Sequence, residues 1–211
     1  MNEQYPVQFS VDYPDRPLNR LTTFFRIFTV IPILIVLGAL MNSSWGGGWG
    51  YDDQTTYYAL GGASFLFIAP LLMILFRKKY PRWWFDWNLE LLRFTNRVGI
   101  FVALMDDRYP STDDHQAVRL DYPYPNAETE LGRGMPLVKW LLAIPHYIVL
   151  FFLHIGAFFA VVFAWFAILF TGRYPRGLFD FVEGVIRWNN RVTAYAYLLV
   201  TDKYPPFRLG Q

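Results

Sequence analysis

The pattern of apolar and polar residues is dominated by two long stretches, 27–76 and 140–172, that contain no Lys or Arg. The first stretch holds two apolar segments, 27–41 and 58–76, on either side of a polar, glycine-rich loop. A helix that is apolar all round is typical of a lipid surrounding or of a deep protein core. We therefore expect two short transmembrane helices in this part of the chain.

The second stretch predicts a further pair of helices. Residues 137–170 run for 34 positions, and their only charged side chain is Lys139. At about 1.5 Å per residue, one straight helix of that length would far exceed a hydrocarbon core of about 30 Å. We therefore predict a tight turn at residues 154–156 and four short transmembrane helices in all. Hairpins that enter the membrane without crossing it are the alternative.

The basic residues crowd at the chain ends, in the middle and directly after each apolar stretch, as in Arg77-Lys78-Lys79. Cytoplasmic loops of multi-pass membrane proteins carry this excess of Lys and Arg. The chain is therefore predicted to have both termini in the cytoplasm. The 54% of hydrophobic and 20% of aromatic residues agree with this class, and a net charge of only +2 argues against a nucleic-acid partner. The absence of Cys excludes disulfides, thiolate metal sites and cysteine nucleophiles.

An internal repeat organises the chain. Residues 75–98 and 169–192 are identical at 11 of 24 positions, at a constant offset of 94. Further motifs recur in the same order outside these segments, which makes chance a poor explanation. We therefore predict two copies of one unit, residues 1–110 and 117–211, joined by a linker at 111–116. The recurring motifs are Asp12-Tyr13-Pro14 with Asp121-Tyr122-Pro123, Arg26…Ile31-Pro32 with Lys139…Ile144-Pro145, and Tyr109-Pro110 with Tyr204-Pro205.

Short alternating segments predict a strand at the start and at the end of each copy. An amphipathic helix before each closing strand should lie flat in the cytoplasmic interface. The fold class is then a mainly α membrane protein with two tandem two-helix repeats, interfacial helices and a small cytoplasmic β-sheet. The opening strands carry Val7, Phe9 and Val11, and Val118 and Leu120; the helices cover 84–97 and 178–190; the closing strands cover 98–105 and 192–200.

Five segments of the second copy carry specific motifs: AIPH (143–146), AWFAILFTGRYPRGLFDF (164–181), RWN (187–189), YAYLL (195–199) and DKYPPF (202–207). These motifs resemble a bacterial membrane family catalogued as domain of unknown function 4389. The first copy is a degenerate version of the same pattern. The resemblance implies a bacterial inner-membrane location, but it implies no activity and supplies no catalytic residue.

The turn Tyr-Pro-Arg-x-x-Phe-Asp occurs in both copies, at 80–86 and 174–180. Its simpler interpretation is a corner where the chain leaves the membrane: Pro ends a helix, Tyr lies at the interface, and Asp caps the next helix or pairs with Arg. Its functional interpretation is a lipid-headgroup site, because guanidinium groups bind phosphate bidentately. The headgroup candidates are Arg82, Arg93, Arg97, Arg176, Arg187 and Arg191.

His146 and His154 are polar candidates inside the predicted membrane region, where an ionisable residue is a functional candidate by default. The first copy has Ile33 opposite His146, and neither Cys nor a carboxylate lies in these spans. We therefore expect neutral packing histidines rather than a metal site or a proton relay. The Gly46–Asp53 loop lacks the Lys of a phosphate-binding loop and the spaced oxygens of a calcium loop, so we expect an aromatic outer loop.

Function is predicted only in outline, with no catalytic residue, cofactor site or metal site in the pattern. The favoured hypothesis is a non-enzymatic accessory or scaffold subunit of a larger complex in the bacterial inner membrane. Its partners would be membrane lipids and another protein. The alternatives are a small transporter or channel and a lipid-handling protein, each with a path between the two copies.

Overall fold

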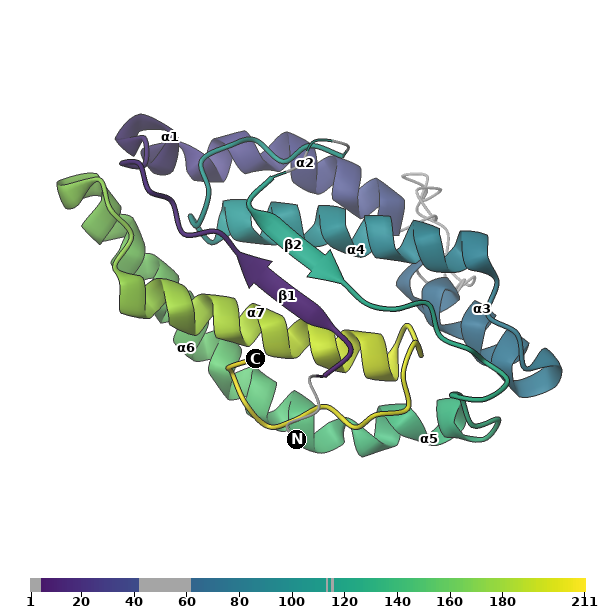
Figure 1. Cartoon of the computed structure of the whole chain (residues 1–211). Helices are drawn as coiled ribbons and strands as arrows, with labels where there is room; N and C mark the ends of the chain where they lie inside the picture. The colour runs from purple at the N-terminus through teal and green to yellow at the C-terminus, as the bar shows by residue number, and fades with distance from the viewer. Residues whose placement is uncertain (1–4, 42–61, 113, 115) are drawn as a thin grey trace, which may run out of the picture.

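The computed structural model describes residues 5–41, 62–112, 114 and 116–211. In this part the protein is mainly helical and has one small sheet, as predicted. Figure 1 shows the two strands in front of α4 and α7, with α6 partly hidden behind α7. The elements are β1 (Gln8–Val11), α1 (Arg20–Phe24), α2 (Arg26–Met41), α3 (Gly62–Arg77), α4 (Arg82–Val102), β2 (Val118–Asp121), α5 (Met135–Leu142), α6 (Ile144–Thr171) and α7 (Arg176–Ala196).

The opening strands are confirmed, and they pair with each other. β1 and β2 are antiparallel, with Phe9 opposite Leu120. The alternation of β1 is the reason for its position: Val7, Phe9 and Val11 are buried against the helices, while the residues between them lie on the other side of the strand. The prediction of a four-stranded sheet is wrong for the described residues, where the sheet has two strands.

The two predicted closing strands, 98–105 and 192–200, are also wrong. The amphipathic helices α4 and α7 continue through most of these residues, to Val102 and Ala196. The alternation of Ala and Tyr near the end of α7 misled the sequence analysis because Ala194, Tyr195 and Ala196 are all buried. In a segment that is packed on several sides, an alternation of small and large residues does not distinguish a buried face from an exposed one. Periodicity therefore cannot tell a strand from a buried helix in such a segment.

The predicted turn at 154–156 is absent, because α6 is one continuous helix from Ile144 to Thr171. Gly156 lies inside this helix, where a Cβ atom would come within 3.3 Å of the Phe181 ring of α7. Gly156 therefore allows α6 and α7 to pack closely at this point, and it does not form a turn. The helix ends at Gly172, whose φ of 74° is the left-handed conformation that suits a glycine C-cap.

Only α6, among the described helices, is long and apolar enough to cross a membrane. The predicted apolar segments of the first half do form helices, but α2 and α3 have 16 residues each, short of the roughly 20 that a crossing needs. The prediction of four transmembrane helices is therefore not supported. The glycine-rich loop at Gly46–Asp53, and the outer loop of which it is part, lie outside the described residues.

The outer helices expose most of their apolar surface. Of the most apolar 18-residue window of α6, only 17% is buried inside the protein. Helix α2 likewise buries one stripe, which includes Val30 and Ile33 against α4, and exposes the rest. The molecule thus has three layers: the sheet, the α4–α7 pair, and an outer layer of apolar helices.

Candidate functional site

Arg93 and Arg187, which lie 94 positions apart, hold the sheet on the helices. The Nε of Arg93 donates to the carbonyl oxygen of Leu120 at 2.9 Å, and the Nε of Arg187 donates to that of Phe9 at 2.9 Å. Since Phe9 and Leu120 face each other across the sheet, each arginine ties one helix to the middle of one strand. Arg187 also pairs with Glu183, one turn earlier on α7.

Arg97 and Arg191 bind the chain segments that follow the two helices. Arg97 donates from Nη1 to the carbonyl oxygens of Ser111 and Thr112, at 2.8 and 2.9 Å. Arg191 donates to the carbonyl oxygens of Arg208 and Gly210, at 3.2 and 2.9 Å. Burial, reinforced by neighbouring arginines, lowers the pKa of Arg191 to about 10. Hydrogen bonds to the backbone therefore engage both of these headgroup candidates.

Arg82 and Arg176 differ from the other four candidates because their side chains are 74% and 66% exposed. Each pairs with the carboxylate one turn later, Arg82 with Asp86 at 3.9 Å and Arg176 with Asp180 at 3.2 Å. These carboxylates do not cap the helices, since the N-cap positions are held by prolines without a side-chain bond. Each guanidinium also lies over a tyrosine ring, Arg82 over Tyr124 and Arg176 over Tyr13.

Asn96 and Asn190 join α4 to α7 at the centre of the molecule. The Nδ2 of Asn96 donates to Oδ1 of Asn190 at 2.9 Å, and the Nδ2 of Asn190 donates back to Oδ1 of Asn96 at 2.7 Å. Both side chains are buried. Two residues separated by the 94-residue offset thus satisfy each other in a reciprocal pair.

The two histidines do not form one site. His146 is fully buried, accepts a hydrogen bond from the indole of Trp188 at 3.0 Å and stacks on Phe207 at 4.0 Å. His154 lies eight residues further along α6 on an exposed face, with Nδ1 2.6 Å from the carbonyl oxygen of Leu150. Among the described residues, no group of three or more His, Cys, Asp or Glu side chains is placed to hold a metal ion.

Lys139 is the most deeply buried charge of the second half, and the sequence analysis did not select it. Its ammonium group lies 2.7 Å from Oδ1 of Asp202 and donates to the carbonyl oxygen of Thr201 at 2.7 Å. It also lies 5.3 Å from the centre of the Tyr195 ring. Burial lowers the pKa of Lys139, and the Asp202 carboxylate acts in the opposite direction.

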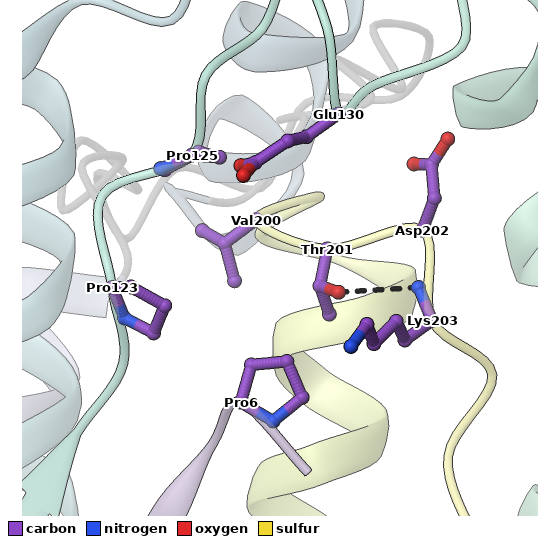
Figure 2. A pocket seen from close by; sticks show the side chains of 8 residues that line it. All are labelled: Pro6, Pro123, Pro125, Glu130, Val200, Thr201, Asp202 and Lys203. Carbon is purple, nitrogen blue, oxygen red and sulfur yellow. Dashed lines mark hydrogen bonds between the residues drawn. The ribbon is translucent and has the colours of Figure 1, made fainter. Parts of the chain in front are cut away.

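A hollow of about 510 Å³ is lined in part by Thr201 and Asp202, the two residues that Lys139 binds. Figure 2 shows prolines on one side of it and Thr201, Asp202 and Lys203 on the other. The backbone N–H of Lys203 donates to the Thr201 hydroxyl at 3.1 Å, and Asp202 accepts from the backbone of Gly132 at 2.8 Å. These bonds fix the loop that carries Asp202. The lining residues are Pro6, Pro123, Pro125, Glu130, Val200, Thr201, Asp202 and Lys203.

Arg26 of α2 is another buried cation, with a similar set of contacts. It is 4% exposed, donates to the carbonyl oxygen of Asp106 at 3.0 Å and lies 3.9 Å from the centre of the Phe101 ring. A second hollow, of about 450 Å³, is lined by Asp106 and its neighbours Met105 and Arg108, among others. The signal for both sites was present in the sequence, because Arg26 and Lys139 are the basic residues that recur before the Ile-Pro motifs.

These contacts define a mainly helical protein that, among the described residues, has five buried basic side chains, a reciprocal amide pair between α4 and α7, and an exposed apolar outer layer. Residues 135–208 match the family model described as domain of unknown function (DUF4389). The resemblance drawn from the sequence is thereby confirmed for this segment, which contains Lys139, α6 and α7. No curated protein and no solved structure matches the chain.

Proposed function

We propose that the protein is a non-enzymatic membrane protein whose outer layer lies in a lipid bilayer. The observation that carries the proposal is the exposure of α6: a core helix of a soluble protein would be mostly buried, whereas only 17% of the most apolar window of this helix is. Exposed apolar surface on this scale marks a membrane or a protein interface. Helix α5, which packs next to α6, and helix α2 also expose large hydrophobic residues.

We further propose that the two halves are copies of one unit. The matched contacts support this: Arg93 and Arg187 bind facing carbonyls of the sheet, and Asn96 and Asn190 bind each other. Arg26 and Lys139 also have comparable surroundings, each over an aromatic ring and each donating to a backbone carbonyl. A pseudo-two-fold axis through the asparagine pair relates these contacts.

The role that best fits these contacts is an accessory or scaffold subunit of a larger membrane complex. A transporter or channel would need a path between the two halves, and at that boundary the Asn96 and Asn190 amides satisfy each other directly. The N- and C-terminal segments lie on the sheet side, where the Tyr5 hydroxyl donates to the carbonyl oxygen of Lys203 at 3.1 Å. This placement supports two termini on one side of the membrane, which the charge pattern assigns to the bacterial cytoplasm.

Lipid headgroups are the second class of partner in the proposal. Arg82 and Arg176 are the candidates that the structure leaves exposed, and Trp83 beside Arg82 is 65% exposed. An exposed arginine next to an aromatic side chain at the edge of an apolar layer suits a phosphate at the membrane interface.

The test is purification in mild detergent from native membranes, through a tag on the C-terminus. We expect the chain in the membrane fraction after alkaline washing, together with a stoichiometric protein partner. Recovery in the soluble fraction would contradict the membrane assignment, and a preparation that contains only lipid would contradict the scaffold role.

The headgroup assignment has its own measurement. Co-purified anionic phospholipid should fall at least twofold in the Arg82→Ala/Arg176→Ala variant and stay unchanged in Arg119→Ala, which removes an equally exposed arginine from the sheet. An equal loss in both variants would show that net charge, rather than these two positions, governs lipid binding.

A further inference from the structure

Helix α7 packs antiparallel against α6. Near the start of α6, His146 bonds to Trp188 of α7. In the middle, Gly156 faces Phe181. Beyond the end of α6, residues 172–175 return the chain to the start of α7. Helix α7 therefore accompanies α6 over most of its length, and α1 packs against the last part of α6, where the indole of Trp165 donates to the carbonyl oxygen of Thr23 at 3.2 Å.

The opposite face of α7 carries charge along its length. Arg191 lies near its end, the Glu183–Arg187 pair lies in the middle, and the exposed Arg176–Asp180 pair lies at its start. A line of ionic groups thus runs parallel to α6, one helix diameter away.

Strand β1 packs on this charged face of α7, and its backbone groups and the following Asp12 add further polar groups there. The backbone N–H of Val11 donates to Glu183 at 3.2 Å, and Arg187 binds the carbonyl oxygen of Phe9. The next residue, Asp12, forms an ion pair with Arg119 at 3.2 Å, and both side chains are more than half exposed. The sheet is therefore a water-facing surface level with the middle of α6.

A perpendicular α6 would carry these exposed charges into the hydrocarbon core, where ionised side chains are strongly disfavoured. It would also be about 42 Å long for its 28 residues, against a core of about 30 Å. Because α7 and the sheet are packed against α6, a crossing α6 would place the charged layer inside the bilayer as well. The arrangement of layers is therefore incompatible with a perpendicular α6.

The other side of α6 is apolar from end to end. Its exposed residues are hydrophobic except for His154, which bonds within the helix, and Thr171 at the end, whose hydroxyl donates to the carbonyl oxygen of Ala167. The described side chains that α2 exposes are likewise uncharged, and the hydroxyl of Thr29 among them donates to the carbonyl oxygen of Arg26. The large exposed hydrophobic residues of α6 are Ile144, Ile148, Val149, Phe151, Phe152, Ile155, Phe158, Phe159, Val162, Phe163, Phe166 and Phe170.

We propose that α2 and α6 lie parallel to the membrane plane in a single leaflet, with α4, α7 and the sheet stacked above them on the cytoplasmic side. This orientation rests on the proposed membrane location and replaces the crossing helices with a monotopic arrangement. Helices of this kind bury one apolar face at the headgroup and acyl-chain boundary. The pseudo-two-fold axis then stands along the membrane normal.

Lipid is the occupant that the charges around this layer favour. Arg20 lies next to the residue before Arg173, where α1 meets the end of α6: a Cβ at Gly172 would come within 3.8 Å of the Arg20 guanidinium, and the Gly172 carbonyl accepts a hydrogen bond from the backbone of Leu18. Arg77, the last residue of α3, and Lys79 just after it are also exposed. Basic residues at the margin of an apolar face complement anionic headgroups, whereas a protein interface of this size normally carries polar groups within it.

The natural absence of Cys makes single-cysteine spin labelling the direct test. Labels at Phe151→Cys, Phe158→Cys and Phe166→Cys occupy exposed positions spread along α6, with steps of roughly 11 Å between them. Their depth in reconstituted vesicles follows from accessibility to oxygen and to a water-soluble nickel complex. We expect equal depths at all three positions. A label at Ser10→Cys on the sheet should remain accessible to nickel.

A depth maximum at position 158, with 151 and 166 shallower by about 10 Å, would overturn the in-plane orientation and leave the membrane location intact. Recovery of every variant, and of the unlabelled chain, outside the vesicles would instead refute the proposed function. A second measurement avoids labels on α6 altogether. Arg133→Cys before α5 and Arg173→Cys after α6 should react with an impermeant thiol reagent from the same side of sealed vesicles, because a crossing α6 would place them on opposite sides.

Discussion

Arg26 and Lys139 are equivalent residues in the proposed duplication, yet their charges are compensated differently. Lys139 has a carboxylate partner, Asp202, and a carbonyl partner. Arg26 has a carbonyl and an aromatic ring, while its Nε and Nη2 are buried with no hydrogen-bond partner among the described residues. In each case a buried cation binds the loop that follows α4 or α7. A carboxylate compensates the charge of Lys139, whereas a carbonyl group and an aromatic ring surround the charge of Arg26.

The largest expected effect comes from breaking the pair of the second half. Lys139→Met should lower the free energy of unfolding by about 3 kcal/mol, because it leaves Asp202 without its cation in a largely desolvated place. Arg26→Met should cost less, since no carboxylate would be stranded. Chemical denaturation in detergent gives both values. Adding Asp202→Asn to Lys139→Met should recover part of the loss, and a double variant as unstable as the sum of the single ones would show that the two residues are not coupled.

The same pair predicts a pH dependence. The pKa of Lys139 is lower in the folded protein than its usual 10.5, so the folded state binds fewer protons than the unfolded chain at pH values between the two. The free energy of unfolding contributed by this group should therefore rise as pH increases through the lowered pKa towards 10.5. Denaturation of Lys139→Met across this range, compared with the wild type, isolates the contribution, and identical pH profiles would contradict it.

A smaller effect is expected where the two halves meet. Asn96→Ala should lower the free energy of unfolding by about 2 kcal/mol, because the Asn190 amide would be left buried without its reciprocal partner. Asn96→Ala/Asn190→Ala should cost clearly less than the sum of the two single variants. Additive losses would mean that the amides do not act as a pair.

Two glycines of α7 test how tightly the C-terminal segment packs on this helix. A Cβ at Gly184 would lie 2.9 Å from Cβ of Leu209 and 3.3 Å from its carbonyl oxygen, whereas a Cβ at Gly177 would meet nothing within 4 Å. Gly184→Ala should therefore destabilise by about 1 kcal/mol, against the helix preference for alanine. Gly177→Ala, near the start of the same helix, should be neutral or slightly stabilising. Equal thermal shifts in the two variants would contradict the close contact.

The smallest expected effect is that of the exposed ion pair on the sheet. Arg119→Ala removes the partner of Asp12, and both side chains are in contact with water. The free energy of unfolding should change by less than about 0.5 kcal/mol, in keeping with surface pairs in general. A larger loss would indicate that this surface is covered by a partner when the measurement is made.

Local patterns predicted the elements whose two faces differ. The alternation at Val7, Phe9 and Val11 identified β1, and the amphipathic pattern located α4 and α7, although their ends were placed too early. The pattern failed where both faces have the same character. Residues 192–196 are packed on several sides, so their pattern could not distinguish a strand from a helix. Helix α6 has apolar residues all round, so its pattern could not show whether the helix is broken by a turn or continuous.

The candidate site was harder to predict because hydrogen bonds to distant backbone leave no local signal. Arg93, Arg97, Arg187 and Arg191 were predicted as headgroup candidates, whereas the structure binds them to backbone carbonyls as far as 178 residues away. Lys139 is the only charged residue in its segment, and the recurring motif before Ile-Pro pairs it with Arg26. Their partners, the carbonyls after α4 and α7, could be found only from the fold.

The link between Phe9 and Arg187 also has a consequence for how the chain folds during synthesis. Strand β1 is synthesised before both of its partners, β2 and α7, and Phe9 precedes Arg187 by 178 residues. At about 5–20 residues per second, roughly 10–35 s pass between these two residues. The contacts of β1 with α7 therefore form late in synthesis, so the rate-limiting step of folding should be the closure of β1 onto the second half.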